Sequence, residues 1–395
     1  MSSRGSTRIA YARHLSALLA LLSSLALAGS ASAAGEIFIR GAGFGHGVGM
    51  SQYGAYGYAL HGRNYRSILA HYYTGTSLGA VDPHEIVTVL LATRGAAFRG
   101  ATRAGAVKLR PALTYDVRAL AGGRLAVVKT DGKLLGSFSV PLTVTGPGPL
   151  TIPGLGDYRG SLEFRPTAPG RVETIDAVGL DDYVRGVVAA EMPSGWSMQA
   201  LEAQAVAART YAITTDAGGS DFQQYSDTRS QMYGGVRAET PRSDAAVAAT
   251  RGRVVTYDGR PAVTYFFSSS GGHTENNESV WPGSTPDPWL RGVPDPYDGA
   301  GANPNHRWLV ELTAARATSK LHGLLDGAFV VIIGLAHGVS PRIITAKVVG
   351  GEGNREVSGA ELEQRFGLDS TWATFTTITT VARPYASGVP SAGTR

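Results

Sequence analysis

The chain has 395 residues, a formal net charge of +5 and no cysteine. The absence of cysteine excludes disulfide bonds and thiol chemistry, so a protein of this kind is stabilised by its hydrophobic core. The sequence contains no cluster of Lys and Arg with interleaved aromatic residues, which argues against a nucleic-acid partner.

The first 34 residues have the pattern of an export signal. Three arginines precede an apolar run at residues 15–28, and Ala31-Ser32-Ala33 has the small-x-small pattern of a cleavage site. The run is shorter than the roughly 20 residues that span a bilayer, which favours a cleaved signal over a retained anchor. We expect a signal peptide over residues 1–34, cleavage near Ala33 or Ala34, and a secreted or cell-envelope protein without a membrane segment. Loss of the three arginines lowers the net charge from +5 to about +2.

Residues 43–55, with the sequence GFGHGVGMSQYGA, form the most unusual stretch of the chain. Glycine at every second position around His46 is typical of neither a helix nor an ordinary strand. Because glycine loses much conformational entropy on folding and has no side chain to pack, we interpret the run as backbone that a ligand or another segment approaches closely. The run does not match Gly-x-Gly-x-x-Gly in any register, which excludes a dinucleotide-binding loop.

A helical hairpin follows the glycine run. Ser51 can cap a helix that ends near Leu60, with Gly62 as its stop, and residues 65–73 form a second amphipathic segment. We expect residues 35–80 to be a glycine-rich block and helical hairpin that pack on the rest of the protein.

Residues 81–172 have the pattern of a β-rich insert. Short Val, Leu and Thr runs at 87–91, 125–130 and 142–144 are separated by Gly and Pro, which is typical of short strands joined by turns.

Residues 173–376 form the most regular part of the sequence, and residues 377–395 are a tail. Asp181 or Asp182 can cap a helix that Pro193 ends, and an alanine-rich helix at 198–214 has the composition of a buried one. A helix at 243–250 precedes a hairpin over 254–267 with a type I′ turn at Asp258-Gly259. The predicted fold class is α+β, a core of packed helices and antiparallel strands with the β-rich insert between the glycine block and the core.

Glu191 is the strongest candidate for chemistry. It follows apolar residues at the end of a predicted helix, where burial and the helix dipole both raise the pKa of a carboxyl group. A carboxylic acid that stays protonated near neutral pH suits general-acid catalysis. The alternative is an ordinary ion pair with Arg185 or Arg209.

A second catalytic carboxylate is not apparent. Asp182 lies nine residues before Glu191 on the same predicted helix, about 13 Å away, whereas the carboxylate pairs of glycosidases are about 5 to 9.5 Å apart. Glu202 lies beyond the Pro193 break, so the sequence does not place it. A mechanism with one carboxylate is the simpler interpretation.

Other candidate residues are weaker. The segment Ser268-Ser269-Ser270-Gly271-Gly272 lacks the Gly-x-Ser-x-Gly elbow of a serine nucleophile, so a turn that shapes a groove is the better interpretation. The histidines lack metal-ligand spacing, and His46 can simply be hydrogen-bonded among glycines. We expect no metal and no cofactor.

Together these motifs resemble the SpoIID/LytB family, named for stage II sporulation protein D and an amidase enhancer. The resemblance covers roughly residues 173–370 and 41–79. It rests on the glycine run and on five further blocks, which are DYVRGVVAAEMP at 182–193, AQAVAARTYA at 203–212, QMYGG at 231–235, YFFSSSGGHTEN at 265–276 and Trp281.

The resemblance implies a peptidoglycan lytic transglycosylase. Sporulation members of the family cut glycan strands between N-acetylmuramic acid and N-acetylglucosamine, prefer strands without stem peptides, and leave a 1,6-anhydro end. By this resemblance Glu191 is the catalytic acid, while Arg209 and Gln204 orient it and bind sugar. Further substrate-binding residues are expected in the groove: Tyr265, Ser268, Ser270, Gly271, His46 and Gln52.

This chain departs from the family pattern at three places. Glu202 stands where many members have Lys, which changes the local charge. Arg229 and Ser230 stand where some members have a zinc-binding His-Cys pair, so no metal is expected there. The glycine block precedes the core instead of following it, so we expect the two parts to meet in space, with residues 43–52 beside the Glu191 helix.

Two alternatives remain open at the level of sequence. The chain can be a non-catalytic glycan-binding enhancer of a separate amidase or wall hydrolase, because relatives of the amidase-enhancer type stimulate such enzymes. It can also be a structural wall protein, which would depend on none of these residues. In every case the expected partner is the peptidoglycan glycan strand.

Overall fold

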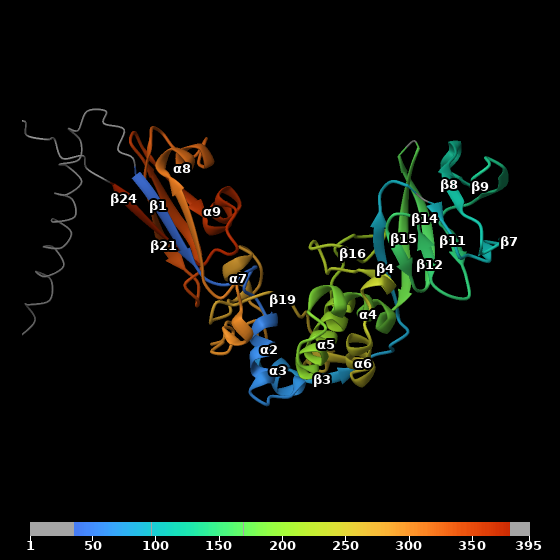
Figure 1. Ribbon diagram of the computed structural model, residues 1–395, viewed down its shortest axis with the longest axis horizontal. Coiled ribbons are helices and arrows are strands. Elements are labelled where there is room, and N and C mark those ends of the chain that lie inside the picture. The colour runs from blue at the N-terminus through green and yellow to red at the C-terminus, as the bar shows by residue number, and fades with distance from the viewer. Residues whose placement is uncertain (1–34, 96, 169, 380–395) are drawn as a thin grey trace, which may run out of the picture.

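The computed structural model describes residues 35–95, 97–168 and 170–379. The predicted signal peptide and residues 380–395 of the predicted tail lie outside the described residues. Figure 1 shows a central helical part at the bottom of the view, with one β-rich unit rising on each side of it.

The helices are α2 (Gln52–Leu60), α3 (Tyr65–Tyr72), α4 (Leu180–Glu191), α5 (Met198–Thr214), α6 (Pro241–Ala249), α7 (Asn277–Val280), α8 (Ala314–Lys320) and α9 (Gly359–Phe366), with 3-10 turns η1 (Ala121–Gly123), η2 (Gly235–Ala238) and η3 (Ala300–Ala302). The predicted helical hairpin is confirmed as α2 and α3. Its caps are side chains, because Ser51 accepts a hydrogen bond from the Gly54 backbone N–H and Asn64 accepts one from that of Ser67.

The alanine-rich helix α5 lies at the centre of the helical part. Its residues 200–212 are all buried. Ala205 and Ala208 belong to a hydrophobic core shared with α4, whereas Ala203 and Val206 belong to a second core shared with α2 and α3. Small side chains on both faces let the neighbouring helices pack close to α5, as the sequence predicted.

The start of α4 differs from the prediction. The helix begins at Leu180, and its N-cap is Gly179, which makes no side-chain hydrogen bond. The prediction of Asp181 or Asp182 as the cap is wrong. Both aspartates lie in the first turn instead, where negative charge interacts favourably with the helix dipole.

The predicted hairpin at 254–267 is correct only in its first half. Strand β17 (Arg253–Tyr257) pairs with β18 (Arg260–Pro261) around Asp258 and Gly259, whose φ values of 48° and 74° are those of a type I′ turn. The remainder forms the short strand β19 (Phe266–Phe267), which pairs in parallel with β2 (Met50–Ser51) instead. Beside them, β3 (Ser77–Ala80) pairs with β17.

The β-rich insert is built mainly from two sheets. Its strands are β4 (Ile86–Ala92), β5 (Ala97–Phe98), β6 (Arg103–Ala104), β7 (Val107–Lys108), β8 (Tyr115–Ala119), β9 (Leu125–Lys129), β10 (Leu134–Phe138), β11 (Leu142–Thr145), β12 (Leu150–Ile152), β13 (Gly156–Tyr158), β14 (Ser161–Ala168) and β15 (Arg171–Gly179). The order of the larger sheet is β16-β4-β15-β14-β11-β6-β7, in which β16 (Gln224–Tyr225) is contributed by the helical part, and the smaller is β10-β9-β8-β5.

The insert positions the start of α4. Strand β15 pairs with β4 and runs directly into α4, where the Leu180 backbone N–H donates to the carbonyl of Glu85.

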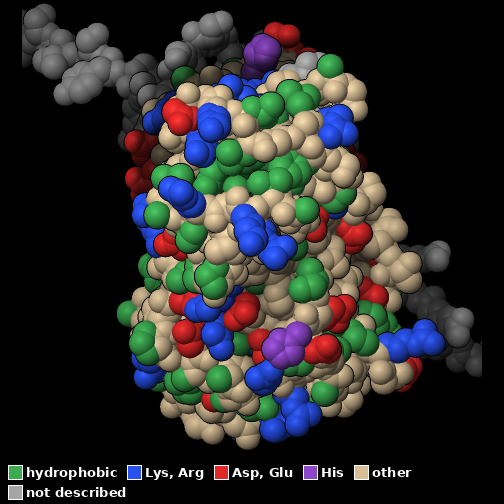
Figure 2. All heavy atoms as spheres, turned by 90° about the vertical axis from the view of Figure 1, so that its right-hand side faces the viewer, with side chains coloured by type: hydrophobic (Ala, Val, Ile, Leu, Met, Phe, Trp, Pro, Cys, Tyr) green, Lys and Arg blue, Asp and Glu red, His purple; other side chains and the backbone are tan. Residues whose placement is uncertain are grey.

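On the face shown in Figure 2, basic and acidic side chains are interspersed with hydrophobic ones.

Residues 308–379 build a separate unit together with the first described strand. Strand β1 (Gly35–Gly41) lies between β20 (Trp308–Thr313) and β24 (Ala373–Thr379). The meander of β21 (Phe329–His337), β22 (Ile343–Gly350) and β23 (Asn354–Ser358) completes the unit with α8 and α9. This unit has its own hydrophobic core, which includes Ile37 and Ile39. The sequence had indicated one continuous core from 173 to 376.

The fold class is α+β, as predicted. Among the helices of the described residues, none is long and apolar enough to cross a membrane.

Candidate functional site

The glycine-rich segment crosses the turn at 268–272 and ends beside Glu191. Phe44 forms a bridge with Ser269, and the Tyr53 backbone N–H donates to the Ser268 carbonyl over 3.0 Å. The next contact is with Glu191 itself, through Gln52. Gln52, the last residue of this segment, therefore contacts the end of the Glu191 helix, although about 140 residues separate the two along the chain.

Close backbone contact explains the glycines. Gly47 and Gly49 have φ values of 90° and 77°, which residues with a side chain rarely adopt. A Cβ atom at Gly49 would lie 2.1 Å from the Tyr265 carbonyl oxygen, and one at Gly47 would lie 2.7 Å from the Arg342 guanidinium carbon. The run is therefore packed against protein on these sides.

Glu191 is the last residue of α4, and both of its carboxyl oxygens accept hydrogen bonds. Oε1 accepts from the Met232 backbone N–H over 2.7 Å, and Oε2 accepts from Gln52 Nε2 over 3.3 Å. The two donors come from segments far apart in the sequence. They hold the carboxyl group in one orientation.

Burial raises the pKa of the Glu191 carboxyl group, because a charged carboxylate is poorly solvated there. The hydrogen bonds from Met232 and Gln52 act in the opposite direction, but burial has the larger effect. Glu191 is thus a half-buried acid whose pKa lies above its ordinary value, as the sequence predicted from its apolar neighbours.

A cavity of about 470 Å³ opens at Glu191. This volume suits a small ligand or a sugar unit. Its lining residues come from the glycine run, α4, α5, the loop at 228–230, the segment 265–268 that contains β19, and the end of α7. They are Phe44, Gly45, His46, Glu191, Tyr211, Thr228, Arg229, Ser230, Tyr265, Phe266, Phe267, Ser268 and Trp281. Aromatic rings dominate, and among these lining residues Glu191 is the single acid and Arg229 the single Lys or Arg.

His46 is a fixed, neutral member of the aromatic lining. Its Nδ1 accepts a hydrogen bond from the Val48 backbone N–H over 3.0 Å, so the ring proton is on Nε2. Burial, with a smaller effect from the positive charge of Arg342, lowers the pKa of His46 to about 4. The centre of its ring lies 5.3 Å from the ring centres of both Phe267 and Trp281. At neutral pH His46 therefore contributes shape rather than a proton.

Arg209 does not reach the site. Its Nε donates to Asp181 over 2.6 Å, and its Nη1 donates to the Ala205 and Arg253 carbonyls. Asp181 lies ten residues from Glu191, about 15 Å along α4. The structure does not support the expectation that Arg209 orients the acid. Its buried guanidinium pairs with Asp181 in the first turn of α4, whereas Glu191 is the last residue of that helix.

Three further predicted residues also lie outside the cavity lining. Gln204 is fully buried, and neither amide atom has a hydrogen-bond partner among the described residues. Ser270 Oγ donates to Asp295, and the Gly271 backbone N–H donates to Asp298. Ser270 and Gly271 thus hold the turn to two buried carboxylates and are not part of the cavity lining.

Besides Glu191, three predicted residues line the cavity, and one contacts the acid from outside the lining. His46, Tyr265 and Ser268 are in the lining, whereas Gln52 contacts the acid. Sequence reasoning assigned no role to Tyr211, Trp281 or the Met232 amide. Tyr211 and Trp281 lie within the blocks that carry the family resemblance, and this was the available signal.

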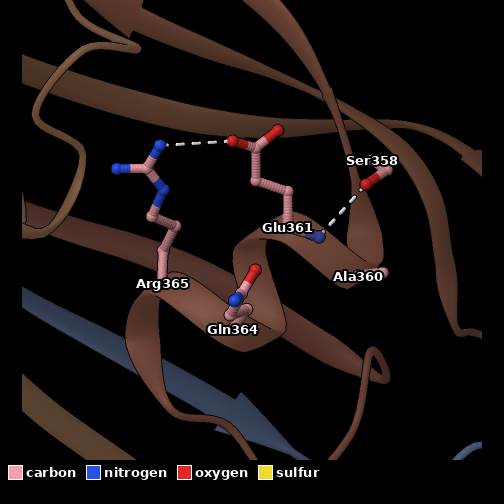
Figure 3. A pocket seen from close by; sticks show the side chains of 5 residues that line it. All are labelled: Ser358, Ala360, Glu361, Gln364 and Arg365. Atoms are coloured by element: carbon pink, nitrogen blue, oxygen red, sulfur yellow. Dashed lines mark hydrogen bonds and ion pairs between the residues drawn. The ribbon is translucent and has the colours of Figure 1, made fainter. Parts of the chain in front are cut away.

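A larger hollow of about 680 Å³ lies over α9. It is lined by Ser358, Ala360, Glu361, Gln364 and Arg365, and Figure 3 shows that Glu361 and Arg365 pair with each other there. It lacks aromatic residues, so we place the site at Glu191. In the part of the chain that the structure describes, no group of three or more His, Cys, Asp and Glu residues has the arrangement of a metal site.

Comparisons with known proteins identify the family of this chain. The sequence profile of the family described as "Stage II sporulation protein" (SpoIID) matches residues 168–257, which include α4, α5 and Glu191. Stage II sporulation protein D of Bacillus subtilis is 31% identical over 240 residues, which cover 55% of this chain and 67% of that protein. The protein of the same name from Bacillus amyloliquefaciens is 30% identical over 215 residues, 50% of this chain and 60% of that protein.

A third relative connects the chain to the other branch of the family. The amidase enhancer of Bacillus subtilis is 41% identical over 103 residues, which cover 26% of this chain and only 14% of the relative. These similarities show that the chain belongs to the SpoIID family.

Proposed function

We propose that this protein is an exported peptidoglycan lytic transglycosylase that cuts glycan strands between the muramyl and glucosaminyl sugars, in sporulation or wall remodelling. The observation that carries the proposal is the single carboxyl group in an aromatic cavity. Glu191 has a raised pKa and is held by two donors, and flat aromatic rings of the kind that stack on sugar faces surround it. Membership of the SpoIID family supports a role in sporulation and the cell wall.

One carboxyl group suffices for this reaction. Protonated Glu191 donates its proton to the bridging glycosidic oxygen as the bond from the anomeric carbon breaks. The muramyl 6-hydroxyl then forms a new bond to that carbon, and its proton returns to Glu191. The product is a 1,6-anhydro sugar, and no water is consumed.

The geometry supports this mechanism over a two-carboxylate hydrolysis. Asp182 is half-buried near the start of α4 and pairs with Arg185. Glu202 points to Gln199 on its own helix, over 2.9 Å, and is not part of the cavity lining. Neither carboxylate is available to activate a water opposite Glu191.

The second candidate is a non-catalytic glycan-binding enhancer of a separate wall hydrolase. The similarity to the amidase enhancer of Bacillus subtilis favours it. The sequence departure at Glu202 no longer favours this candidate, because the Glu202 side chain is not part of the cavity lining.

Incubation of the purified protein lacking residues 1–34 with peptide-free glycan strands tests the proposal. We expect anhydro-muramyl products by mass spectrometry. We also expect Glu191→Gln to lower their rate of formation by about a hundredfold or more, since general acid catalysis contributes roughly 10²- to 10⁴-fold.

Glu202→Gln is the matched control, because it makes the same change of charge outside the cavity and should retain activity. Strand binding without products from the native protein would favour the enhancer instead. Equal rates from the native protein and Glu191→Gln would remove Glu191 from the mechanism.

A further inference from the structure

Arg229 brings a positive charge to the wall of the cavity that contains Glu191. It lies in the loop between β16 and Met232, together with Thr228 and Ser230. Its side chain is 60% exposed, so the charge is accessible to a ligand. Sequence reasoning had treated Arg229 only as the place of a missing metal ligand.

The orientation of the Arg229 guanidinium is set by its own loop. Nε and Nη2 donate to the two carboxylate oxygens of Asp227 over 2.9 and 2.7 Å, and the backbone N–H of Arg229 also donates to Asp227. The guanidinium carbon lies 3.7 Å from the ring centre of Tyr225. An arginine held by a two-point ion pair and an aromatic ring is ordered before any ligand binds.

The same arrangement leaves part of the guanidinium unused. Asp227 occupies the edge formed by Nε and Nη2, whereas Nη1 makes no hydrogen bond with the residues that the structure describes. A guanidinium with free N–H groups in an exposed cavity is suited to bind a carboxylate.

We propose that Arg229 recognises the free lactyl carboxylate of a muramyl sugar placed beside Glu191. This inference rests on the proposed function, because it takes the ligand to be a peptidoglycan strand. The lactyl carboxylate is the anionic group of an unmodified strand. When a stem peptide is attached, that carboxylate becomes a neutral amide, and the pairing with Arg229 is lost. Arg229 thus makes the site selective for peptide-free muramyl sugars.

Two strand preparations test the selectivity. One has free lactyl carboxylates, and in the other the same groups are converted to methylamides, which removes the charge without adding the bulk of a peptide. For the native protein we expect kcat/KM to be about tenfold higher on the free strands, equivalent to one charge-assisted pairing. For Arg229→Gln the ratio should fall towards one, chiefly through KM for the free strands.

Two variants control for indirect effects. Arg229→Lys should keep part of the ratio, because it retains the charge but loses the two-pronged geometry. Arg237→Gln removes an exposed arginine of η2 outside the cavity lining and should leave the ratio unchanged. Equal losses on both strand types in Arg229→Gln, with a normal melting temperature, would overturn the inference, and so would an unchanged ratio.

Binding separates this inference from the proposed function. In Glu191→Gln, the dissociation constants of the two strand types are measured with and without Arg229→Gln. If the native protein makes no anhydro product, but Glu191→Gln binds free strands about tenfold more tightly in an Arg229-dependent manner, the proposed function fails and the inference stands. Equal binding of the two strand types would overturn the inference, even if cleavage occurs.

Discussion

In the proposed reaction Glu191 acts as an acid and, after proton transfer, as a base, and its two hydrogen bonds fit both states. The Met232 N–H can only donate, so it stabilises the carboxylate at Oε1. Gln52 carries both a donor and an acceptor on its amide, so rotation of this amide lets it accept a hydrogen bond from protonated Oε2. The glycine-rich segment therefore supplies the residue that adapts to the protonation state of the acid.

Replacing Gln52 by Ala should move the alkaline limb of the activity profile to higher pH. The proposed reaction begins with protonated Glu191, so the activity should fall as the pH rises through its pKa. The Gln52 hydrogen bond lowers this pKa, and its loss therefore raises it. At the pH optimum the rate should fall by less than about tenfold, since one hydrogen bond contributes about 1 kcal/mol.

Initial rates of anhydro-product formation, measured from about pH 4 to about pH 9, give the shift of the alkaline limb. This interval covers roughly the range in which perturbed carboxyl groups titrate. Gln199→Ala is the matched control, because Gln199 pairs with Glu202 away from the cavity. A limb that stays in place or moves to lower pH in Gln52→Ala would show that Gln52 does not tune the acid.

At the scale of elements, the glycine-rich segment joins three parts of the protein. It pairs with β19 through β2, reaches Glu275 through the Gly47 carbonyl, and leads into α2 at Gln52. This position explains why its backbone conformation matters more than its one histidine. His46 is neutral and contributes ring packing, whereas Gly49 allows a contact that no side chain would permit.

Gly49→Val should therefore be far more damaging than His46→Gln. We expect Gly49→Val to lower the free energy of unfolding by more than about 2 kcal/mol, from backbone strain at positive φ and the clash with the Tyr265 carbonyl. His46→Gln should cost about 1 kcal/mol from lost aromatic packing. Urea denaturation measures the stability of each variant, and anhydro-product formation measures its activity. A larger loss of activity in His46→Gln than in Gly49→Val would indicate that His46 takes part in the reaction.

At the scale of the whole molecule, Arg342 connects the terminal β unit to the wall of the site. It is almost fully buried, and it donates to the carbonyls of His273 and Ser270 over 3.1 and 3.3 Å. Its guanidinium also packs against Gly47 and the ring of Phe267. The unit formed by β1 and residues 308–379 thus contacts the glycine-rich segment through Arg342.

Arg342→Ala should destabilise the protein and reduce its activity together. Removing this buried charged donor leaves the carbonyls of His273 and Ser270 without their partner and opens space beside Gly47. We therefore expect the free energy of unfolding to fall by about 3 kcal/mol. Thermal unfolding and hydrogen exchange at residues 43–52 measure the effect. Arg355→Ala, in which an exposed arginine contacts the Gly323 carbonyl, is the matched control. Unchanged exchange at 43–52 in Arg342→Ala would show that the terminal unit does not support the site.

Local signals in the sequence were sufficient for most helices and for the acid. The alanine spacing of α5 and the Pro193 stop of α4 are read from neighbouring residues, and so is the apolar environment that raises the pKa of Glu191. The helix cap at Gly179 was not predictable in this way, because β15 and Glu85 fix the start of α4 through long-range hydrogen bonds.

The sequence by itself determined the family motifs, the helical hairpin, the candidate acid and the need for glycine at positions 43–49, because each depends on residue type and short spacing. Only the tertiary structure decided which distant groups meet. In the structure Gln52 and Met232 donate hydrogen bonds to Glu191, and Arg209 pairs with Asp181. Strand β1 pairs with β20 and β24 of the unit at residues 308–379. The physical reason is that hydrogen bonds and core packing across more than a hundred residues leave no periodic trace in the sequence.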